Sequence, residues 1–252
     1  MPPPGPATPG MAGQAQAPRR RRPWLIVYWV TFGLLGAAFV GLLVGAFTTA
    51  AVVTVPGAGM APTVPVGSRV IYQRGATGVV RGDIVLVRVN GVLFLRRLIG
   101  LPGDHVSCCT DDARISVNGK VLIEDYVSTV ATPYADTRFN VSVPPGEIWV
   151  MGDDRGGAID SRQWGPIPMS DILGRAFIVS GSGSQTLLRT PAVFTANRLA
   201  PADHRRPLAI VLLEVAAVVL LVMVVQGVVG LIVWLVRRGR RKRTRQPQPA
   251  AW

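Results

Sequence analysis

The sequence contains little lysine, histidine or cysteine, and charge is nearly absent from two long stretches. Of 252 residues, only Lys120 and Lys242 are lysines, and there are two histidines and two cysteines. No group of histidine, cysteine and acidic residues has the spacing typical of a metal site, so we expect no metal and no other cofactor. The scarcity of lysine also leaves few candidates for a catalytic lysine base.

The two stretches with little charge are long enough to cross a membrane. Residues 24–53 contain no charged residue, and residues 208–236 contain only Glu214. About 20 helical residues cross the hydrocarbon core of a bilayer, so we predict transmembrane helices over residues 23–54 and 207–236. The first run is about twice as long as the apolar part of a signal peptide, and no clear A-x-A cleavage site follows it. This favours a retained anchor over a cleaved signal peptide.

The net charge of +13 is concentrated beside these two stretches. Residues 19–22 carry +4 and residues 237–245 carry +7, whereas residues 55–206 carry a net charge of only +3. Short Lys/Arg-rich flanks of transmembrane helices stay in the cytoplasm, so we predict cytoplasmic tails over residues 1–22 and 237–252. The first tail is rich in proline and is expected to be disordered. The basic flanks favour contact with anionic lipids of the bilayer, and the lack of interleaved aromatic residues argues against a nucleic-acid partner.

Residues 55–206 are predicted to form one mainly β domain on the outer side of the membrane. Short β-branched runs alternate with glycine and proline turns, as expected for an antiparallel, barrel-like domain. The Asn118-Gly119 pair between two such runs is a strong hairpin signal. The predicted strands cover residues 69–72, 84–89, 92–99, 115–117, 121–123, 147–151 and 176–180.

Three segments of this domain resemble the signature boxes of bacterial type I signal peptidases. Residues 55–63, V-P-G-A-G-M-A-P-T, resemble the S-M-x-P-T box just after the first helix. Residues 81–85, R-G-D-I-V, and 94–104, F-L-R-R-L-I-G-L-P-G-D, are similar to the next two boxes. Residues 151–165, M-G-D-D-R-G-G-A-I-D-S-R-Q-W-G, are similar to the last box. The order, the spacing and the position after a membrane helix make the combination specific.

The residues that carry the family's chemistry are replaced at the matching positions. The resemblance implies a serine nucleophile at the position of Gly59, a lysine general base at that of Arg96, and a base-orienting serine at that of Ala158. Glycine has no nucleophile, and arginine keeps its proton in proteins, so it cannot act as the base. We therefore expect no intact catalytic dyad. Whether the protein is an enzyme stays open at this point.

Other residues of the boxes match positions with structural or binding roles. The resemblance implies structural roles for Asp153, Arg155, Asp160 and Arg162, the last two as a salt bridge. The family binds an extended segment of its substrate beside a strand, with small side chains entering shallow pockets. The implied substrate groove contains Pro56, Gly57, Ala58, Met60, Asp83 and Val85.

Substitutes for the missing dyad are few. Ser68 and Ser161 are candidate nucleophiles, but the single lysine of the outer domain, Lys120, lies on the predicted Asn-Gly turn as a solvated charge. His105 and His204 have acidic neighbours in sequence, which does not create the geometry of a triad.

Three further features have two interpretations each. Cys108 and Cys109 form either a vicinal disulfide, on the oxidising side of the membrane, or two free or buried thiols. Glu214 in the second helix is either functional or an ion-pair partner of arginines just outside it. Small residues occur at every fourth position from Gly33 to Gly45. They either form a face that packs against another helix or have no packing role, because small residues are common in transmembrane helices.

Two functions compete for such a chain. The first is a member of the signal peptidase family in the bacterial cytoplasmic membrane that binds signal peptides, or an active signal peptidase paralogue, without cleaving. The second is a signal peptidase with an atypical site, and a purely structural membrane protein is a further alternative. We favour the first, because three substitutions fall together on the catalytic positions.

Overall fold

A computed structural model describes residues 23–75, 78–109, 114–127, 138–181, 184–201 and 206–243. The predicted tail over residues 1–22 and the end of the chain after residue 243 lie outside the described residues. The chain divides into two compact units, one formed by residues 1–37 with 222–252 and the other by residues 38–221.

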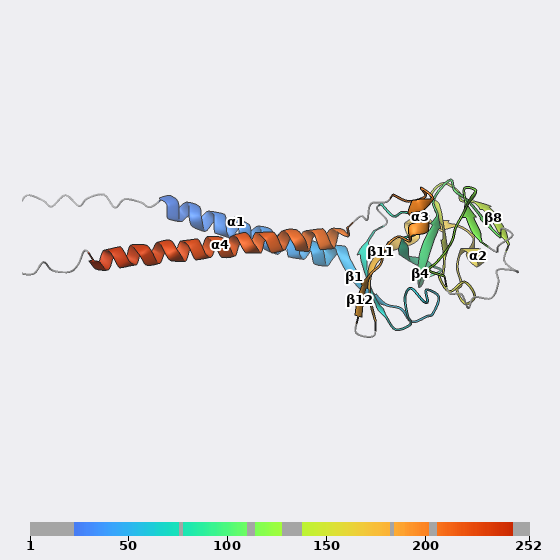
Figure 1. Ribbon diagram of the computed structural model, residues 1–252, viewed down its shortest axis with the longest axis horizontal. Coiled ribbons are helices and arrows are strands. Elements are labelled where there is room, and N and C mark those ends of the chain that lie inside the picture. The colour runs from blue at the N-terminus through green and yellow to red at the C-terminus, as the bar shows by residue number, and fades with distance from the viewer. Residues whose placement is uncertain are drawn as a thin grey trace, which may run out of the picture. The chain divides into compact units, whose positions relative to one another are not determined.

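The first unit contains the start of helix α1 (Pro23–Thr49) and the end of helix α4 (Leu208–Arg243), which lie side by side (Figure 1). The Tyr28 hydroxyl donates to the carbonyl of Gln226 at 3.2 Å, and the Gln226 amide donates to Thr31 Oγ1 at 2.8 Å. Gly230 allows the Tyr28 ring to approach, since a Cβ there would lie only 2.6 Å from its hydroxyl oxygen. Polar pairs of this kind stabilise contacts between helices in an apolar environment.

Both helices are long and apolar enough to cross a membrane. The apolar spans cover Trp24–Thr49 with 26 residues and Leu208–Gly239 with 32 residues. Most side chains of both spans are exposed, as expected for helices whose natural surroundings are lipid. The prediction of two such helices is confirmed.

The ends of the two helices differ from the prediction. The first was predicted to reach residue 54, but α1 ends at Thr49 and residues Ala50–Thr54 form strand β1. This segment contains Val52, Val53 and Thr54, and β-branched residues of this kind favour strands; it pairs with strand β2 (Arg69–Arg74). The second helix continues seven residues beyond the predicted end at residue 236, through an arginine-rich segment with good helix propensity.

The small residues of α1 do not form the continuous packing face that was considered. A side chain on Gly33 or Gly41 would meet no atom within 4 Å. A Cβ on Gly45 would contact Leu212 at 3.3 Å, and one on Gly36 would contact Met223 at 3.7 Å. Close approach therefore occurs at single glycines rather than along the predicted stripe.

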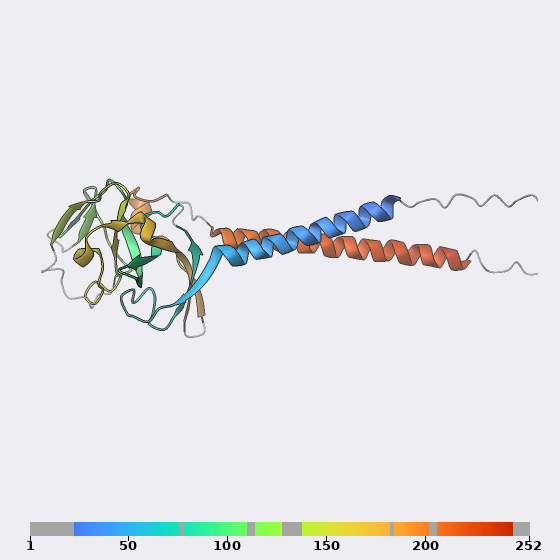
Figure 2. The same cartoon turned by 180° about the vertical axis from the view of Figure 1, so that it is seen from behind.

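The second unit is built on antiparallel strands, as Figures 1 and 2 show from opposite sides. Its larger sheet has the order β1, β2, β11 (Ile172–Gly181), β3 (Ile84–Val89), β4 (Val92–Gly100), β9 (Glu147–Met151) and β10 (Ile167–Pro168), with β12 (Ser184–Leu187) also on β11. The second sheet has the order β7 (Lys120–Val121), β6 (Ile115–Val117), β5 (His105–Cys108) and β8 (Phe139–Ser142). The predicted mainly antiparallel β class is confirmed.

Short helical segments complete this unit. They are α2 (Ser161–Trp164), the 3-10 turn η2 (Met169–Asp171) and α3 (Ala192–Ala196). Phe194 of α3 is fully buried in a core that also contains Trp149 and the apolar residues of the second sheet. Two other cores lie against the larger sheet, one around Met60, Val64 and Val70 and one around Val85, Val87 and Leu98.

Several strand predictions match the structure. The ranges 84–89, 115–117 and 147–151 coincide with β3, β6 and β9, and the predicted hairpin turn has positive φ at both Asn118 (53°) and Gly119 (76°). Positive φ at both central residues is the conformation that favours Asn-Gly in a two-residue hairpin.

Candidate functional site

The loop after β9 meets the turn after β1 and the middle of β4. Arg96 of β4 is opposite Val85 of β3 in the sheet, and its neighbour Arg97 is opposite Met151 at the end of β9. Beyond Met151 the chain forms a loop over residues 152–160 before α2 begins. This arrangement brings together segments that are about 90 residues apart in the sequence.

Arg96 lies at the centre of this meeting point. The residue is 7% exposed, and its Nε and Nη2 donate to the carbonyl of Ile159 at 2.9 and 2.8 Å. Its Nη1 donates to the carbonyl of Leu95 at 2.6 Å. Burial lowers the pKa of Arg96, but an arginine starts so high that it stays charged in proteins.

Gly59 leaves the space that the Arg96 side chain uses. A Cβ on Gly59 would lie 2.9 Å from Nη1 and 3.2 Å from both Cζ and Nη2 of Arg96. Contacts below 3.0 Å are too short for real Cβ atoms, so a side chain at position 59 requires the guanidinium to move.

Gly152 brings the third position into the same cluster. A Cβ on Gly152 would overlap both the side chain of Ala158 and the carbonyl oxygen of Gly59. The backbone N–H of Asp154 donates to this Gly59 oxygen at 3.3 Å. The structure therefore brings together Gly59, Arg96 and Ala158, which the sequence analysis selected from three separate boxes.

The loop is held by ion pairs on both sides. Arg97 Nε donates to Asp153 at 2.8 Å, and the Thr63 hydroxyl donates to the other Asp153 oxygen at 2.6 Å. Arg155 pairs with Glu124, a residue from the segment after β7. Both pairs are buried, so removing one partner would leave an uncompensated buried charge.

The end of the loop is fixed by Asp160. This side chain caps α2, accepts from the N–H of Gly152 at 2.9 Å and forms an ion pair with Arg162 at 2.8 Å. The predicted pair of Asp160 and Arg162 is therefore present. Arg97 and Glu124 were not singled out in the sequence. Arg97 lies within a quoted box, whereas Glu124 is outside all boxes and had no signal of its own.

The implied groove residues occupy two different environments. Pro56, Gly57 and Ala58 are exposed, whereas Met60 is buried in a core. Val85 is also fully buried, and β3 is paired with β11 on one side and β4 on the other. A peptide cannot add to a strand that is paired on both edges, so the groove prediction is corrected at Val85.

Asp83 lies beside a different cavity of about 240 Å³, whose lining includes Arg175, Thr190 and Arg206. Its carboxylate accepts from the N–H of Val80 at 2.9 Å and from the Thr190 hydroxyl at 3.3 Å. Burial raises the pKa of Asp83, against the N–H of Val80 and the charge of Arg175. The place of Asp83 in the groove stays a prediction.

The candidate substitutes do not form a second dyad within the described residues. Ser161 Oγ is buried and accepts from the N–H of Val150 at 3.0 Å, and Ser68 is also buried. Lys120 is exposed and donates to the carbonyl of Asn197, and His105 Nδ1 lies 3.3 Å from Ser142 Oγ. His204 lies outside the described residues.

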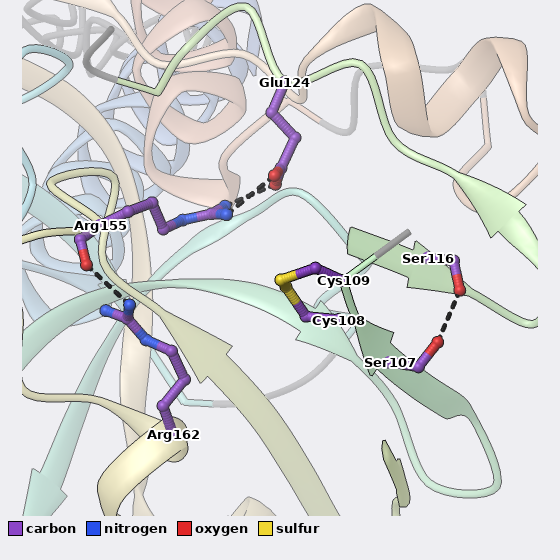
Figure 3. Close-up of a disulfide and its surroundings, with 7 residues drawn as sticks. All are labelled: Ser107, Cys108, Cys109, Ser116, Glu124, Arg155 and Arg162. Carbon is purple, nitrogen blue, oxygen red and sulfur yellow. Dashed lines mark hydrogen bonds and ion pairs between the residues drawn. A yellow bond between two sulfur atoms is a disulfide. The ribbon is translucent and has the colours of Figure 1, made fainter. Parts of the chain in front are cut away.

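Two open alternatives are resolved at other places in the second unit. Cys108 and Cys109 form a disulfide with an S–S distance of 2.02 Å, on the second sheet and near the Glu124–Arg155 pair (Figure 3). Glu214 pairs with Arg206 at 3.1 Å, and both side chains are largely exposed. The structure thus agrees with the interpretation of Glu214 as an ion-pair partner.

Comparison with known proteins identifies the family. The sequence model of signal peptidase, peptidase S26, matches residues 26–180, which is more than half of the chain. The chain belongs to the signal peptidase S26 family. Together with two helices of membrane-spanning length, this membership indicates association with a membrane.

Individual members of the signal peptidase family show the extent of the similarity. A probable signal peptidase I-2 of Synechocystis sp. is 33% identical over 162 residues, which cover 60% of this chain and 72% of that protein. Signal peptidase I U of Bacillus subtilis is 32% identical over 137 residues, covering 50% of this chain and 72% of that protein. A crystal structure of a signal peptidase I from Enterococcus faecalis V583 is 32% identical, covers 38% of this chain and 93% of that chain, and has a TM-score of 0.33.

Proposed function

We propose that this protein binds the signal peptides of exported preproteins and does not cleave them. The observation that carries the proposal is the position of the Arg96 guanidinium, 2.9 Å from where a side chain on Gly59 would begin. A family dyad at these two positions needs a hydroxyl and a neutral amine. Here one position has no side chain and the other has a permanent charge.

Peptide binding does not depend on the lost side chains, because an extended peptide is held mainly by backbone hydrogen bonds to a strand edge. Strand β4 pairs with β9 only from Arg97 onward. In the described part of the chain, no strand pairs with the other edge of Val92–Arg96, and Leu93 on this segment is 45% exposed. We therefore place the bound peptide along this edge, with Pro56, Gly57 and Ala58 near its cleavage region.

We also propose that the second unit faces the outside of a bacterial cytoplasmic membrane and that both tails are cytoplasmic. The two arginine-rich segments at the outer ends of the sequence support this orientation. A signal peptide that emerges during translocation would then meet the site close to the membrane surface.

Site-specific photo-crosslinking tests the binding. A photoreactive residue is placed at Ala58 or Leu93, and at Val121 of the second sheet as a matched control, because Val121 is 41% exposed and Leu93 45%. A translocating preprotein should crosslink from the first two positions and not from Val121. The preprotein should keep its full length.

Two results would contradict the proposal in different ways. The absence of crosslinks at Ala58 and Leu93, while an active family member is labelled in the same membranes, would remove signal-peptide binding. Crosslinks accompanied by cleavage at the signal-peptide junction would instead identify an active peptidase with an atypical site.

A further inference from the structure

The arginines around the loop after β9 differ in their partners. Three of them have a carboxylate of their own, and Arg96 is the fourth. Among the described residues, no carboxylate lies within ion-pair distance of Arg96. The three pairs are Arg97 with Asp153, Arg155 with Glu124, and Arg162 with Asp160.

The hydrogen bonds of Arg96 leave part of its donor capacity unused. A guanidinium has five N–H donors. In the described part of the chain, Arg96 uses three of them, two on the carbonyl of Ile159 and one on that of Leu95. Two donors therefore remain on a buried cation. The charges of Asp160 and Asp153 favour the charged form of Arg96 from beyond ion-pair distance, and its Cζ lies 5.1 Å from the centre of the Phe94 ring. Buried charges are normally paired directly, so an anion in contact with this guanidinium would compensate more of its lost hydration.

The position of Arg96 indicates which anion would complete the pair. Its Nη1 lies next to Gly59, which is only partly buried and follows the exposed residues Pro56, Gly57 and Ala58. In the signal peptidase family, the residue at the position of Gly59 attacks the carbonyl carbon of the scissile bond. A peptide bound in the same register would place this carbon close to the Arg96 guanidinium.

Hydrolysis turns that carbonyl carbon into a carboxylate. Water adds across the peptide bond, the mature protein leaves with a new amino group, and the signal peptide keeps a new C-terminal carboxylate. Arginine is well suited to such a ligand, because its planar donors match the two oxygens of a carboxylate. An uncut peptide offers only a neutral carbonyl at this point.

We propose that Arg96 recognises the C-terminal carboxylate of signal peptides that an active peptidase has already cleaved. This inference rests on the proposed binding of signal peptides and names the form of the peptide that binds best. The protein is then a receptor for the product of the family's reaction. Its ligand is supplied by hydrolysis of a peptide bond elsewhere in the same membrane.

Three synthetic peptides test the inference on the full-length protein in detergent. All share one signal-peptide sequence with alanine at the last and third-last positions. The first ends in a free carboxylate, the second in an amide, and the third continues across the junction into a mature protein. Charge-assisted hydrogen bonds should make the first bind about ten- to a hundredfold more tightly than the other two, as measured by fluorescence anisotropy.

Variants assign this preference to one residue. Arg96→Gln should bind the acid and the amide equally, whereas Arg96→Lys, which keeps the charge, should retain part of the preference. Arg198→Gln is the matched control, because Arg198 is exposed and lies after α3. It should bind all three peptides as the wild type does.

The outcomes separate the two proposals. Equal binding of acid and amide by the wild type would overturn carboxylate recognition and leave signal-peptide binding intact. Failure of all three peptides to bind would overturn signal-peptide binding itself. Both comparisons use the wild type, so they hold even where an Arg96 variant does not fold. A preference that persists in a folded Arg96→Gln variant would assign the carboxylate to another residue.

Discussion

The guanidinium of Arg96 occupies the space beside Gly59 that a side chain at residue 59 would need. The two residues are sterically matched, because Nη1 of Arg96 lies 2.9 Å from the position of a Cβ on Gly59. Lysine is shorter and lacks the planar group, so a lysine at position 96 would release this contact. The glycine at position 59 and the arginine at position 96 therefore depend on each other sterically. Together they also replace the nucleophile and the base of the family.

This coupling predicts a non-additive effect on stability. Gly59→Ala should lower the free energy of unfolding by about 1 kcal/mol in the wild type, because the guanidinium is the end of a flexible side chain but must strain its hydrogen bonds to Ile159 and Leu95 when it moves. In an Arg96→Lys background the same change should cost clearly less. The measurement is a double-mutant cycle of denaturant unfolding in detergent.

Gly57→Ala is the control for this cycle, because a Cβ on Gly57 would meet no atom within 4 Å. It should change the stability little in either background. Equal costs of Gly59→Ala in both backgrounds would show that the Arg96 side chain does not limit the space at residue 59.

Two buried carboxyls should affect the pH dependence of stability in opposite directions. Burial raises the pKa of Asp83 above its ordinary value of 3.8. Burial also acts on Asp104, but the donors of Arg81, Leu101 and Asn118 outweigh it and hold the pKa of Asp104 below 3.8. A raised pKa means that the folded state binds the proton more strongly than the unfolded state does. The contribution of Asp83 to the free energy of unfolding therefore falls as the pH rises from 3.8 through the raised pKa. The contribution of Asp104 is present above 3.8 and is lost as the pH falls through the lowered pKa.

Asparagine variants separate the two contributions. Between acidic and neutral pH, the stability of Asp83→Asn relative to the wild type should rise, because the cost of the buried charge is removed. That of Asp104→Asn should fall over the same interval. Unfolding free energies at several pH values measure both slopes, and slopes of the same sign would contradict the assignment.

The orientation in the membrane predicts a pattern of protease sensitivity. A protease added to intact spheroplasts should cut only within residues 55–206, because both arginine-rich tails are expected on the cytoplasmic side. A tag at the C-terminus should become accessible only after lysis. Loss of that tag in intact spheroplasts would overturn the topology with two membrane-spanning helices.

The sequence predicts the helices and strands well where the distribution of apolar residues along the chain directly indicates their surroundings. The two apolar runs and the strands over residues 84–89 and 147–151 are such cases, because the runs form helices with mostly exposed side chains and the side chains of the two strands are mostly buried. β1 was missed because Ala50–Thr54 continues an uncharged run, in which its β-branched residues were not distinguished from those of a helix, and its pairing with β2 was not visible. Pairing between distant segments is not visible in local periodicity.

The site was predictable in part for a similar reason. The boxes identified Gly59, Arg96 and Ala158, because they preserve order and spacing around each position. They did not reveal that Val85 is enclosed by strands on both sides, since the apolar run along β3 does not tell which strands flank it. The partner of Arg155 was also hidden, because Glu124 comes from a segment that resembles no box.

The final prediction concerns whether the three replaced positions account for the expected lack of cleavage. Gly59→Ser with Arg96→Lys supplies a nucleophile and a base. The lysine would lie in a buried site that lowers its pKa, as its role as a base requires. Ala158→Ser adds a hydroxyl that can hold the lysine amine. Neither single change should give cleavage, because nucleophile and base act as a unit.

The measurement is cleavage of a preprotein by the wild type, both single variants, the double variant and the triple variant, in one membrane preparation. We expect cleavage only from the double and triple variants, at a rate below that of active family members. The glycines at 156 and 157 give the loop behind the lysine more conformational freedom, and a displacement of about 1 Å can cost about a hundredfold in rate. Cleavage by the wild type that persists in Gly59→Ala would refute the assignment, because it would require a nucleophile outside these three positions.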